Sequence, residues 1–98
     1  MKIMSIVINQ DFVSPFVHNI KKELQFIILT KNFSILELNF INVKNMDSVG
    51  LGAILSLYSI LKSRRKKIII NNISDCIYSQ IININEFNRQ IHLYPMNQ

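Results

Sequence analysis

The sequence predicts a small α/β domain, because segments with strand periodicity alternate with segments of helical length along the chain. Residues 35–41 alternate apolar and polar side chains as a half-buried strand does, and residues 49–61 form an uncharged, largely apolar run. With 98 residues, 49% hydrophobic and 17% charged, the chain can build one modest core and is too apolar to be disordered. We expect a single domain over residues 1–98.

The N-terminal half predicts a strand, a helix and a second strand. Residues 2–9 are apolar on both faces of a strand, which favours an interior position in the sheet. Ser14 and Pro15 mark a helix start, with serine as N-cap and proline as the first helical residue, and the helix ends near Thr30. The second strand covers residues 35–41. The apolar positions of the helix are Phe16, Val17, Ile20, Leu24, Ile27 and Ile28.

The C-terminal half continues the alternation and completes a four-stranded sheet, largely parallel or mixed, with about three helices. Residues 83–88 are a polar connection in which Phe87 is the anchor, and Pro95 stops the last strand. The expected elements are a helix over 49–61, a strand over 68–70 that could extend to 72, a short helix capped by Ser74-Asp75 that runs to about 82 with Ile77, Ile81 and Ile82 as core positions, and a strand over 90–94.

The stretch Met46-Asp47-Ser48-Val49-Gly50-Leu51-Gly52 joins the second strand to the following helix. A serine directly before an apolar run is a common N-cap, because its hydroxyl oxygen accepts from the open main-chain N–H groups of the first turn. Gly50 and Gly52 each lower helix propensity by roughly 1 kcal/mol relative to alanine. We therefore expect bare main chain there to serve either packing or the close approach of a partner.

Asp-Ser-x-Gly-Leu-Gly after a strand and opening a helix resembles the signature of STAS domains, above all the anti-sigma factor antagonists. The match would cover nearly the whole chain. The resemblance implies that Ser48 is the phosphoacceptor and that Asp47 assists recognition or orients the hydroxyl. The implied partner-binding residues are Asp47, Ser48, Val49, Gly50, Leu51, Gly52 and Ser56.

The resemblance also implies a mechanism of partner switching. The unphosphorylated antagonist binds an anti-sigma factor that is also a serine kinase, which releases the sigma factor. The kinase uses ATP to phosphorylate Ser48, the complex dissociates, and a phosphatase resets the cycle. The chain would then be a cytoplasmic substrate and binding module that takes part in transcription regulation, with no cofactor and no catalysis of its own.

The residues themselves leave three interpretations of Ser48. It could be only a cap, with Asp47 supplying turn chemistry. A nucleophile would need a base, and neither His18 nor His92 has the spacing of a serine-hydrolase signature. A phosphoacceptor at a helix N-terminus would be tolerated locally, yet it would add about −1.5 to −2 charge to a weakly charged surface. The first interpretation excludes neither of the others.

The helix after Ser48 has too little charge for an ordinary solvated face. Two accounts stay open: a helix wedged between the sheet and neighbouring helices, or a partner surface beside Ser48. The helix carries two stripes. The apolar stripe consists of Ile54, Leu57, Tyr58 and Leu61. The stripe of small residues consists of Gly52, Ser56, Ser59 and Ser63.

Much of the net charge of +5 comes from a basic run after this helix. Cations at a helix C-terminus complement its dipole, and we favour this account over a patch for nucleic acid or anionic lipid. No aromatic residue interleaves the run, so base stacking has no support. The run is Lys62, Arg64, Arg65, Lys66 and Lys67.

The remaining reactive residues indicate no further chemistry. Cys76 is the single cysteine, which excludes an internal disulfide and favours a reducing cytoplasm, and with His18 and His92 it shows no metal-ligand spacing. We expect neither a signal peptide nor a membrane span. Asp11 and Asp47 could form a carboxylate pair. Together with Ser48, Ser74 and Asp75 they follow strand ends and could gather at one edge of the sheet.

The chain departs from the family at both ends. Members commonly begin with an extra strand and end with another helix, whereas little precedes Lys2 and only residues 96–98 follow Pro95. We expect open apolar surface that favours homo-oligomers or a permanent partner. The basic charge raises an alternative: a standalone STAS subunit of a membrane lipid-transport ABC complex that docks on the ATPase without phosphorylation. Serine in place of threonine favours the phosphorylation switch.

Overall fold

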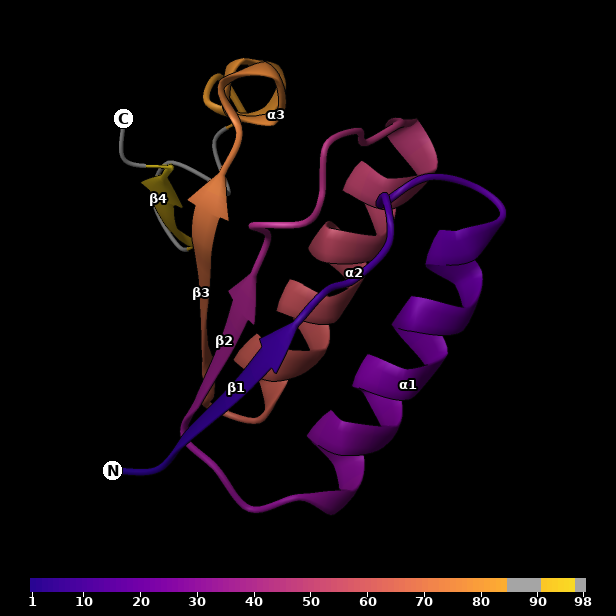
Figure 1. Ribbon diagram of the computed structural model, residues 1–98. Helices are drawn as coiled ribbons and strands as arrows, with labels where there is room; N and C mark the ends of the chain where they lie inside the picture. The colour runs from indigo at the N-terminus through magenta and orange to yellow at the C-terminus, as the bar shows by residue number, and fades with distance from the viewer. Residues whose placement is uncertain (85–90, 97–98) are drawn as a thin grey trace.

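The structure, a computed structural model, describes residues 1–84 and 91–96, and within them it confirms the small α/β fold (Figure 1). Strands and helices alternate in the predicted order. The elements are β1 (Ile3–Val7), α1 (Phe16–Thr30), β2 (Ile35–Asn39), α2 (Ser48–Ser63), β3 (Lys67–Ile73), α3 (Asp75–Ile81) and β4 (His92–Pro95).

The four strands lie in the order β1-β2-β3-β4, and every pair of neighbours is parallel. The predicted interior position of the first strand is wrong, because β1 forms one edge of this sheet. Its second apolar face is open rather than covered, and the Ile3 and Val7 side chains are 54% and 48% exposed. In β1, apolar residues on both faces therefore reflect an exposed apolar face and not an interior strand.

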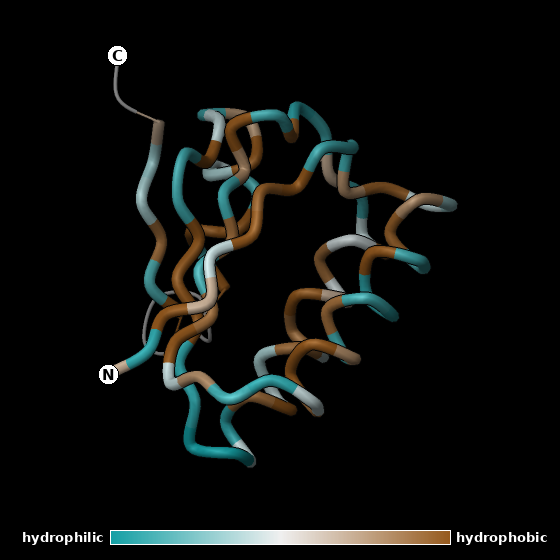
Figure 2. Tube along the Cα trace, turned by 60° about the horizontal axis from the view of Figure 1, so that its bottom comes forward, coloured by the Kyte–Doolittle hydropathy of each residue, from teal (hydrophilic) through white to brown (hydrophobic). Residues whose placement is uncertain are grey.

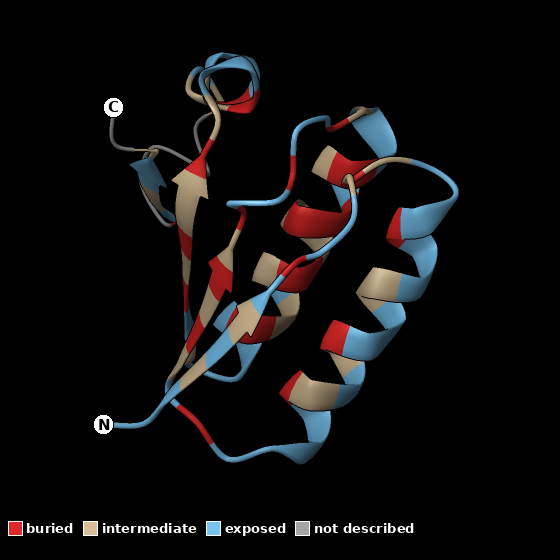
Figure 3. Ribbon diagram, in the orientation of Figure 1, coloured by how far each residue is buried: buried red, intermediate tan, exposed pale blue. Residues whose placement is uncertain are grey.

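Helices α1 and α2 cover the same face of the sheet, and Figure 1 shows them side by side on it. The hydrophobic side of each helix is turned toward the strands (Figure 2), and the buried residues gather between these layers (Figure 3). Leu36 and Leu38 point into this core, whereas Ile35, Glu37 and Asn39 of the same strand are only half-buried on the opposite face. The predicted alternation of apolar and polar residues in the second strand thus corresponds to one sheet face that is covered by helices and one that is open.

The predicted start of the first helix is wrong. Pro15 occupies the N-cap position of α1 without a side-chain cap, and the helix begins at Phe16. The Ser14 main-chain N–H instead donates to Asp47 Oδ2 at 3.0 Å, so this residue serves a contact with a distant loop. Thr30 ends the helix as predicted.

The last strand continues further than predicted. Pro95 pairs with Ile73 as the final residue of β4, and the Met96 N–H still donates to the Ile73 carbonyl at 2.8 Å. Proline is tolerated here because β4 is an edge strand, where its missing N–H breaks no ladder. Gln90 and Phe87, which the sequence assigned to this strand and to the preceding connection, lie outside the described residues.

The basic run closes the C-terminus of α2 through its main chain. The N–H of Lys66 donates to the Leu61 carbonyl and that of Arg65 to the Lys62 carbonyl, with Arg65 at a positive φ of 58°. This is the hydrogen-bond pattern of a Schellman motif, in which glycine is the usual left-handed residue. The Lys66 ammonium group also donates to the Phe33 carbonyl and lies 4.1 Å from the centroid of the Phe33 ring.

Candidate functional site

The loop after β1 and the loop after β2 lie against each other, and the second of them leads into the first turn of α2. We call the two loops and this turn the loop edge. Phe12 and Met46 form an isolated parallel bridge, and the Phe12 N–H donates to the Asn45 carbonyl at 2.9 Å. Beneath them the rings of Phe12 and Phe40 pack with centroids 5.4 Å apart, and both are fully buried. The loop edge is therefore anchored in the hydrophobic core.

Asp11, in the first loop, holds the main chain of the second. Its carboxylate accepts from the N–H groups of Lys44 and Asn45 at 2.9 and 3.2 Å, and from the Asn45 side-chain amide at 2.9 Å. The Asn45 amide and then the Lys44 N–H stabilise the ionised form and lower the pKa of Asp11 below its usual 3.8.

Asp47, in the second loop, holds the main chain of the first and caps α2. Its Oδ1 accepts from the Gly50 N–H at 2.8 Å, and its Oδ2 accepts from the Ser14 N–H at 3.0 Å. These bonds, with the Gly50 bond the larger influence, lower the pKa of Asp47 below 3.8. The two aspartates thus connect the loops reciprocally, and each carboxylate is engaged with main chain rather than with the other.

The predicted N-cap of this helix is corrected: the cap is Asp47, and Ser48 is the first residue of the helix proper. With the capping position taken one residue earlier, the Ser48 hydroxyl has no such role. Ser48 is exposed, and its side chain makes no hydrogen bond within the part of the chain that the structure describes. The hydroxyl is therefore available to a partner while its backbone is fixed.

The two glycines of the first turns serve different purposes. Gly50 is buried, and a Cβ there would lie 2.0 Å from the Phe12 carbonyl oxygen, a separation that forces main chain to move. A Cβ at Gly52 would meet no atom within 4 Å. Gly50 is therefore needed for packing against the loop after β1, whereas Gly52 leaves exposed main chain with open space beside it.

The remaining predicted partner-binding residues divide by exposure. Val49 is 53% exposed, while Asp47, Leu51 and Ser56 are half-buried. Leu51 packs against the hydrophobic core. Of the predicted set, Ser48, Val49 and Gly52 are the exposed members, and the others support the surface from below.

The small-residue stripe continues this open surface along α2. Gly52, Ser59 and Ser63 are exposed and Ser56 is half-buried, whereas Ile54, Leu57 and Leu61 of the apolar stripe are fully buried. The sheet and α1 thus use the apolar stripe. The stripe of small side chains stays open to solvent among the described residues.

Other predicted residues lie elsewhere in the fold. Ser74 accepts from the Ile77 N–H at 3.3 Å and caps α3, as predicted, beyond the carboxyl end of β3 (Figure 1). His18 lies on α1, and His92 lies in β4. Within residues 1–84 and 91–96, no three His, Cys, Asp or Glu side chains gather as a metal site would require. In the same ranges no helix has both the length and the hydrophobicity to cross a bilayer.

The contacts that hold this site together were not predicted from the sequence. Phe12, the Ser14 N–H and the carboxylate of Asp11 all support the Asp47 loop from residues 33 or 34 positions away. The one available signal was Asp11 following a strand end, which placed it at this edge without identifying its hydrogen bonds.

Comparison with known proteins agrees with this architecture. The model of the STAS domain family matches residues 2–97. A predicted anti-sigma factor antagonist from Thermotoga maritima has a similar structure, with a TM-score of 0.82 at 17% identity over 96% of this chain and 80% of that one.

A sulfate transporter family protein from Wolinella succinogenes is also similar, with a TM-score of 0.75 at 13% identity over 96% of this chain and 77% of that one. At these identities the two likenesses establish the fold. No curated protein matches the sequence.

Proposed function

The chain belongs to the STAS domain family, and on that premise we propose that it is a phosphorylation-regulated binding module of the anti-sigma factor antagonist type. In this proposal it binds an anti-sigma factor with serine-kinase activity while Ser48 is unphosphorylated, and it is released when Ser48 is phosphorylated. The observation that carries the proposal is the exposed Ser48 hydroxyl, which makes no hydrogen bond within the described residues because Asp47 caps the helix in its place.

The surface around Ser48 supports a protein partner. Val49 offers an exposed apolar side chain, Gly52 offers bare main chain, and the helix carries no charge before Lys62. A partner can approach such a surface closely without displacing long or charged side chains. We assign direct contact to Ser48, Val49 and Gly52, with Ser56 at the margin, and a supporting role to Asp47, Gly50 and Leu51.

The proposed switch acts by charge. The kinase transfers the γ-phosphoryl group of ATP: a bond forms between Ser48 Oγ and phosphorus, ADP leaves, and the hydroxyl proton passes to a base of the kinase. The phosphate adds about −1.5 to −2 charge, which the N-terminal end of α2 tolerates. A partner docked there faces a new charge that must be desolvated, at a loss of several kcal/mol, and each 1.4 kcal/mol weakens binding about tenfold. A phosphatase reverses the step.

The fold is expected to survive this modification, since the Ser48 hydroxyl makes no hydrogen bond in the described part of the structure. Incubation of the purified protein with a cognate anti-sigma kinase and Mg-ATP should add one phosphate by intact mass. Ser48→Ala should add none, whereas Ser59→Ala, which alters another exposed serine of α2, should behave as wild type. Wild-type protein that stays unmodified beside an active kinase would refute the phosphoacceptor.

The transporter alternative uses the same surface without the switch, and binding separates the two. An antagonist should lose its partner on Ser48→Asp, because the carboxylate imitates part of the phosphate charge. Recovery of an ABC-transporter ATPase from native lysate, with binding unchanged in Ser48→Asp, would instead support the lipid-transport subunit.

A further inference from the structure

The outer edge of β1 carries main-chain groups that point away from the sheet. On its inner side, the Lys2 carbonyl accepts from the Ile35 N–H at 3.2 Å, and the Ile8 N–H donates to the Asn39 carbonyl at 3.0 Å. Even-numbered residues of this strand therefore bond to β2. Because the direction alternates along a strand, the N–H and C=O groups of Ile3, Ser5 and Val7 face outward. No described strand pairs with them.

This edge lacks the features that usually block further pairing. Residues 3–7 read Ile-Met-Ser-Ile-Val, with no charge and no proline, and their pairing with β2 is continuous without a bulge. Natural edge strands are commonly protected by lysine, proline or bulges, because an unprotected edge adds strands readily. The β1 edge, residues 3–7, is thus a complete template for another strand.

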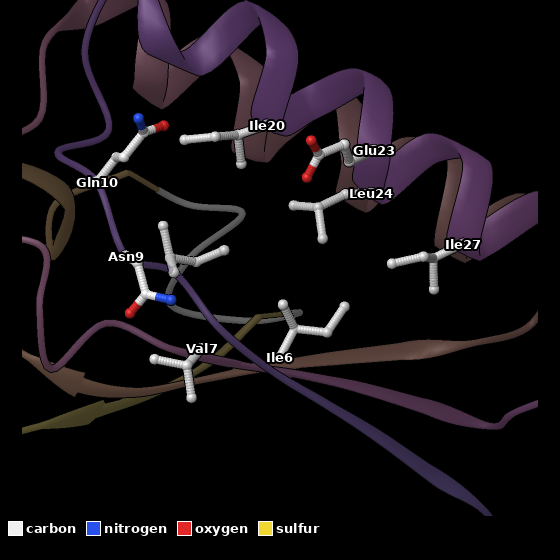
Figure 4. Close-up of a pocket in the computed structure, with 9 residues that line it drawn as sticks. Ile6, Val7, Asn9, Gln10, Ile20, Glu23, Leu24 and Ile27 are labelled. Atoms are coloured by element: carbon white, nitrogen blue, oxygen red, sulfur yellow. The ribbon is translucent and has the colours of Figure 1, made fainter.

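A groove of about 440 Å³ runs along this edge between β1 and α1 (Figure 4). Figure 4 shows side chains from the strand and the helix facing each other across it, with the Glu23 carboxylate on the helix side. A neighbouring strand would therefore place its side chains in a groove that combines apolar side chains with Asn9, Gln10 and one acid, Glu23. The apolar lining residues of the groove are Ile6, Val7, Ile8, Ile20, Leu24 and Ile27.

We propose that the β1 edge pairs with the β1 edge of a second copy of this chain, antiparallel about a twofold axis at Ser5, to give one continuous sheet. This register sets Ile3 opposite Val7 of the second copy, Met4 opposite Ile6, and Ser5 opposite Ser5. It places outward-facing residues only against outward-facing residues. About six main-chain hydrogen bonds then form between the two strands.

The β1 edge is complementary to itself, which favours a second copy of this chain as its partner. Antiparallel pairing joins Ile3 and Val7 on the open face, where each is about half exposed in one copy, at 54% and 48%. On the other face Met4, flexible and half-buried, enters the groove beside Ile6 of the second copy.

Opposite charges also favour this register. Lys2 is exposed and lies opposite Ile8 of the second copy, on the side of the sheet that carries α1. Its ammonium group then approaches Glu23, which lines the groove there. A twofold interface forms this ion pair twice, and it favours this pairing over one shifted along the strand.

The oligomeric state tests the pairing. Light scattering after size exclusion, across the micromolar range, should give a dimer for the wild type. Val7→Pro removes an outward N–H that β2 does not use, so the monomer should fold by circular dichroism while the dimer is lost. Val7→Thr keeps the N–H and should remain dimeric. A monomeric wild type at all these concentrations, or a dimeric Val7→Pro, would overturn the proposal.

Two further variants test the register. Ser5→Cys in a Cys76→Ser background should form a disulfide-linked dimer on mild oxidation, because facing residues of a hydrogen-bonded antiparallel pair lie within disulfide reach. Ile35→Cys in that background lies on the same sheet face but on the interior strand β2, and it should stay reduced.

Lys2→Glu and Glu23→Lys should each weaken the dimer about tenfold, and the double variant should restore it. Equal cross-linking at Ser5 and Ile35, or no rescue in the double variant, would contradict the register.

Discussion

The loop edge around Ser48 and the β1 edge are built in opposite ways. At the loop edge, two carboxylates hold the main chain of both loops and of the first turn of α2, and the exposed Ser48 hydroxyl remains available. At the β1 edge, the outward main-chain groups have no partner among the described residues, and apart from Ser5 the side chains of residues 3–7 are apolar.

The difference separates two kinds of recognition. A fixed backbone with a free hydroxyl suits an interaction that phosphorylation can switch off, because the phosphate changes the charge without breaking a hydrogen bond of the fold. A row of unpaired N–H and C=O groups suits an interaction set by geometry, because the main chain cannot be modified in this way. Changes at one region should therefore leave the other intact.

Gly50→Ala should disrupt the loop edge and cause the largest loss of stability. Its Cβ would meet the Phe12 carbonyl oxygen at 2.0 Å, so main chain must move, and we expect a loss of about 3 kcal/mol or more in the free energy of unfolding. Gly52→Ala is the matched control, since its Cβ meets open space; it should gain roughly 1 kcal/mol from helix propensity. Urea unfolding measures both. Similar losses in the two variants would contradict the close approach at Gly50.

Ser48→Asp should separate binding from folding at the same edge. We expect affinity for an anti-sigma partner to fall at least about a hundredfold, a change of roughly 3 kcal/mol, while the unfolding midpoint stays close to that of the wild type. Titration calorimetry and urea unfolding give the two quantities. A large loss of stability would mean that the hydroxyl has a structural role that the described bonds do not include.

The two aspartates predict how the loop edge responds to acid. Both folded pKa values lie below 3.8, so their contribution to stability is complete above that pH and is lost as the pH falls through the lower folded values. Unfolding free energy should therefore fall below about pH 4. In Asp47→Asn the acid-induced decrease should be smaller than in the wild type, with lower stability at neutral pH. An unchanged pH profile would argue against the carboxylate bonds.

Ile3→Lys at the β1 edge should have the smallest effect on the stability of the fold. The residue is 54% exposed, so we expect the monomer to change by no more than about 0.5 kcal/mol in stability. A lysine on the edge should nevertheless weaken self-association, and phosphorylation at Ser48 should be unaffected. Sedimentation velocity and intact mass provide the two measurements. Reduced phosphorylation would show that the two regions are coupled.

Much of the architecture could be predicted from the sequence because its signals are local. The alternation in residues 35–41 and the length of the apolar run before Lys62 located β2 and α2, and Ser74 was correctly identified as the cap of α3. Each of these depends on side chains within a few positions of one another, where periodicity and capping preferences act. The position of the Ser48 motif between a strand and a helix was predicted correctly for the same reason, whereas its N-cap was not.

What the tertiary structure decided depends on residues far apart in the chain. Asp47 rather than Ser48 caps α2 while also holding Ser14, and Gly50 must lack a side chain because the Phe12 carbonyl lies against it. The edge position of β1 likewise follows from strand order, and two apolar faces could not distinguish a covered strand from an open one. Local preference sets which segments become strands and helices, but only packing determines which main-chain groups they satisfy and which they leave exposed.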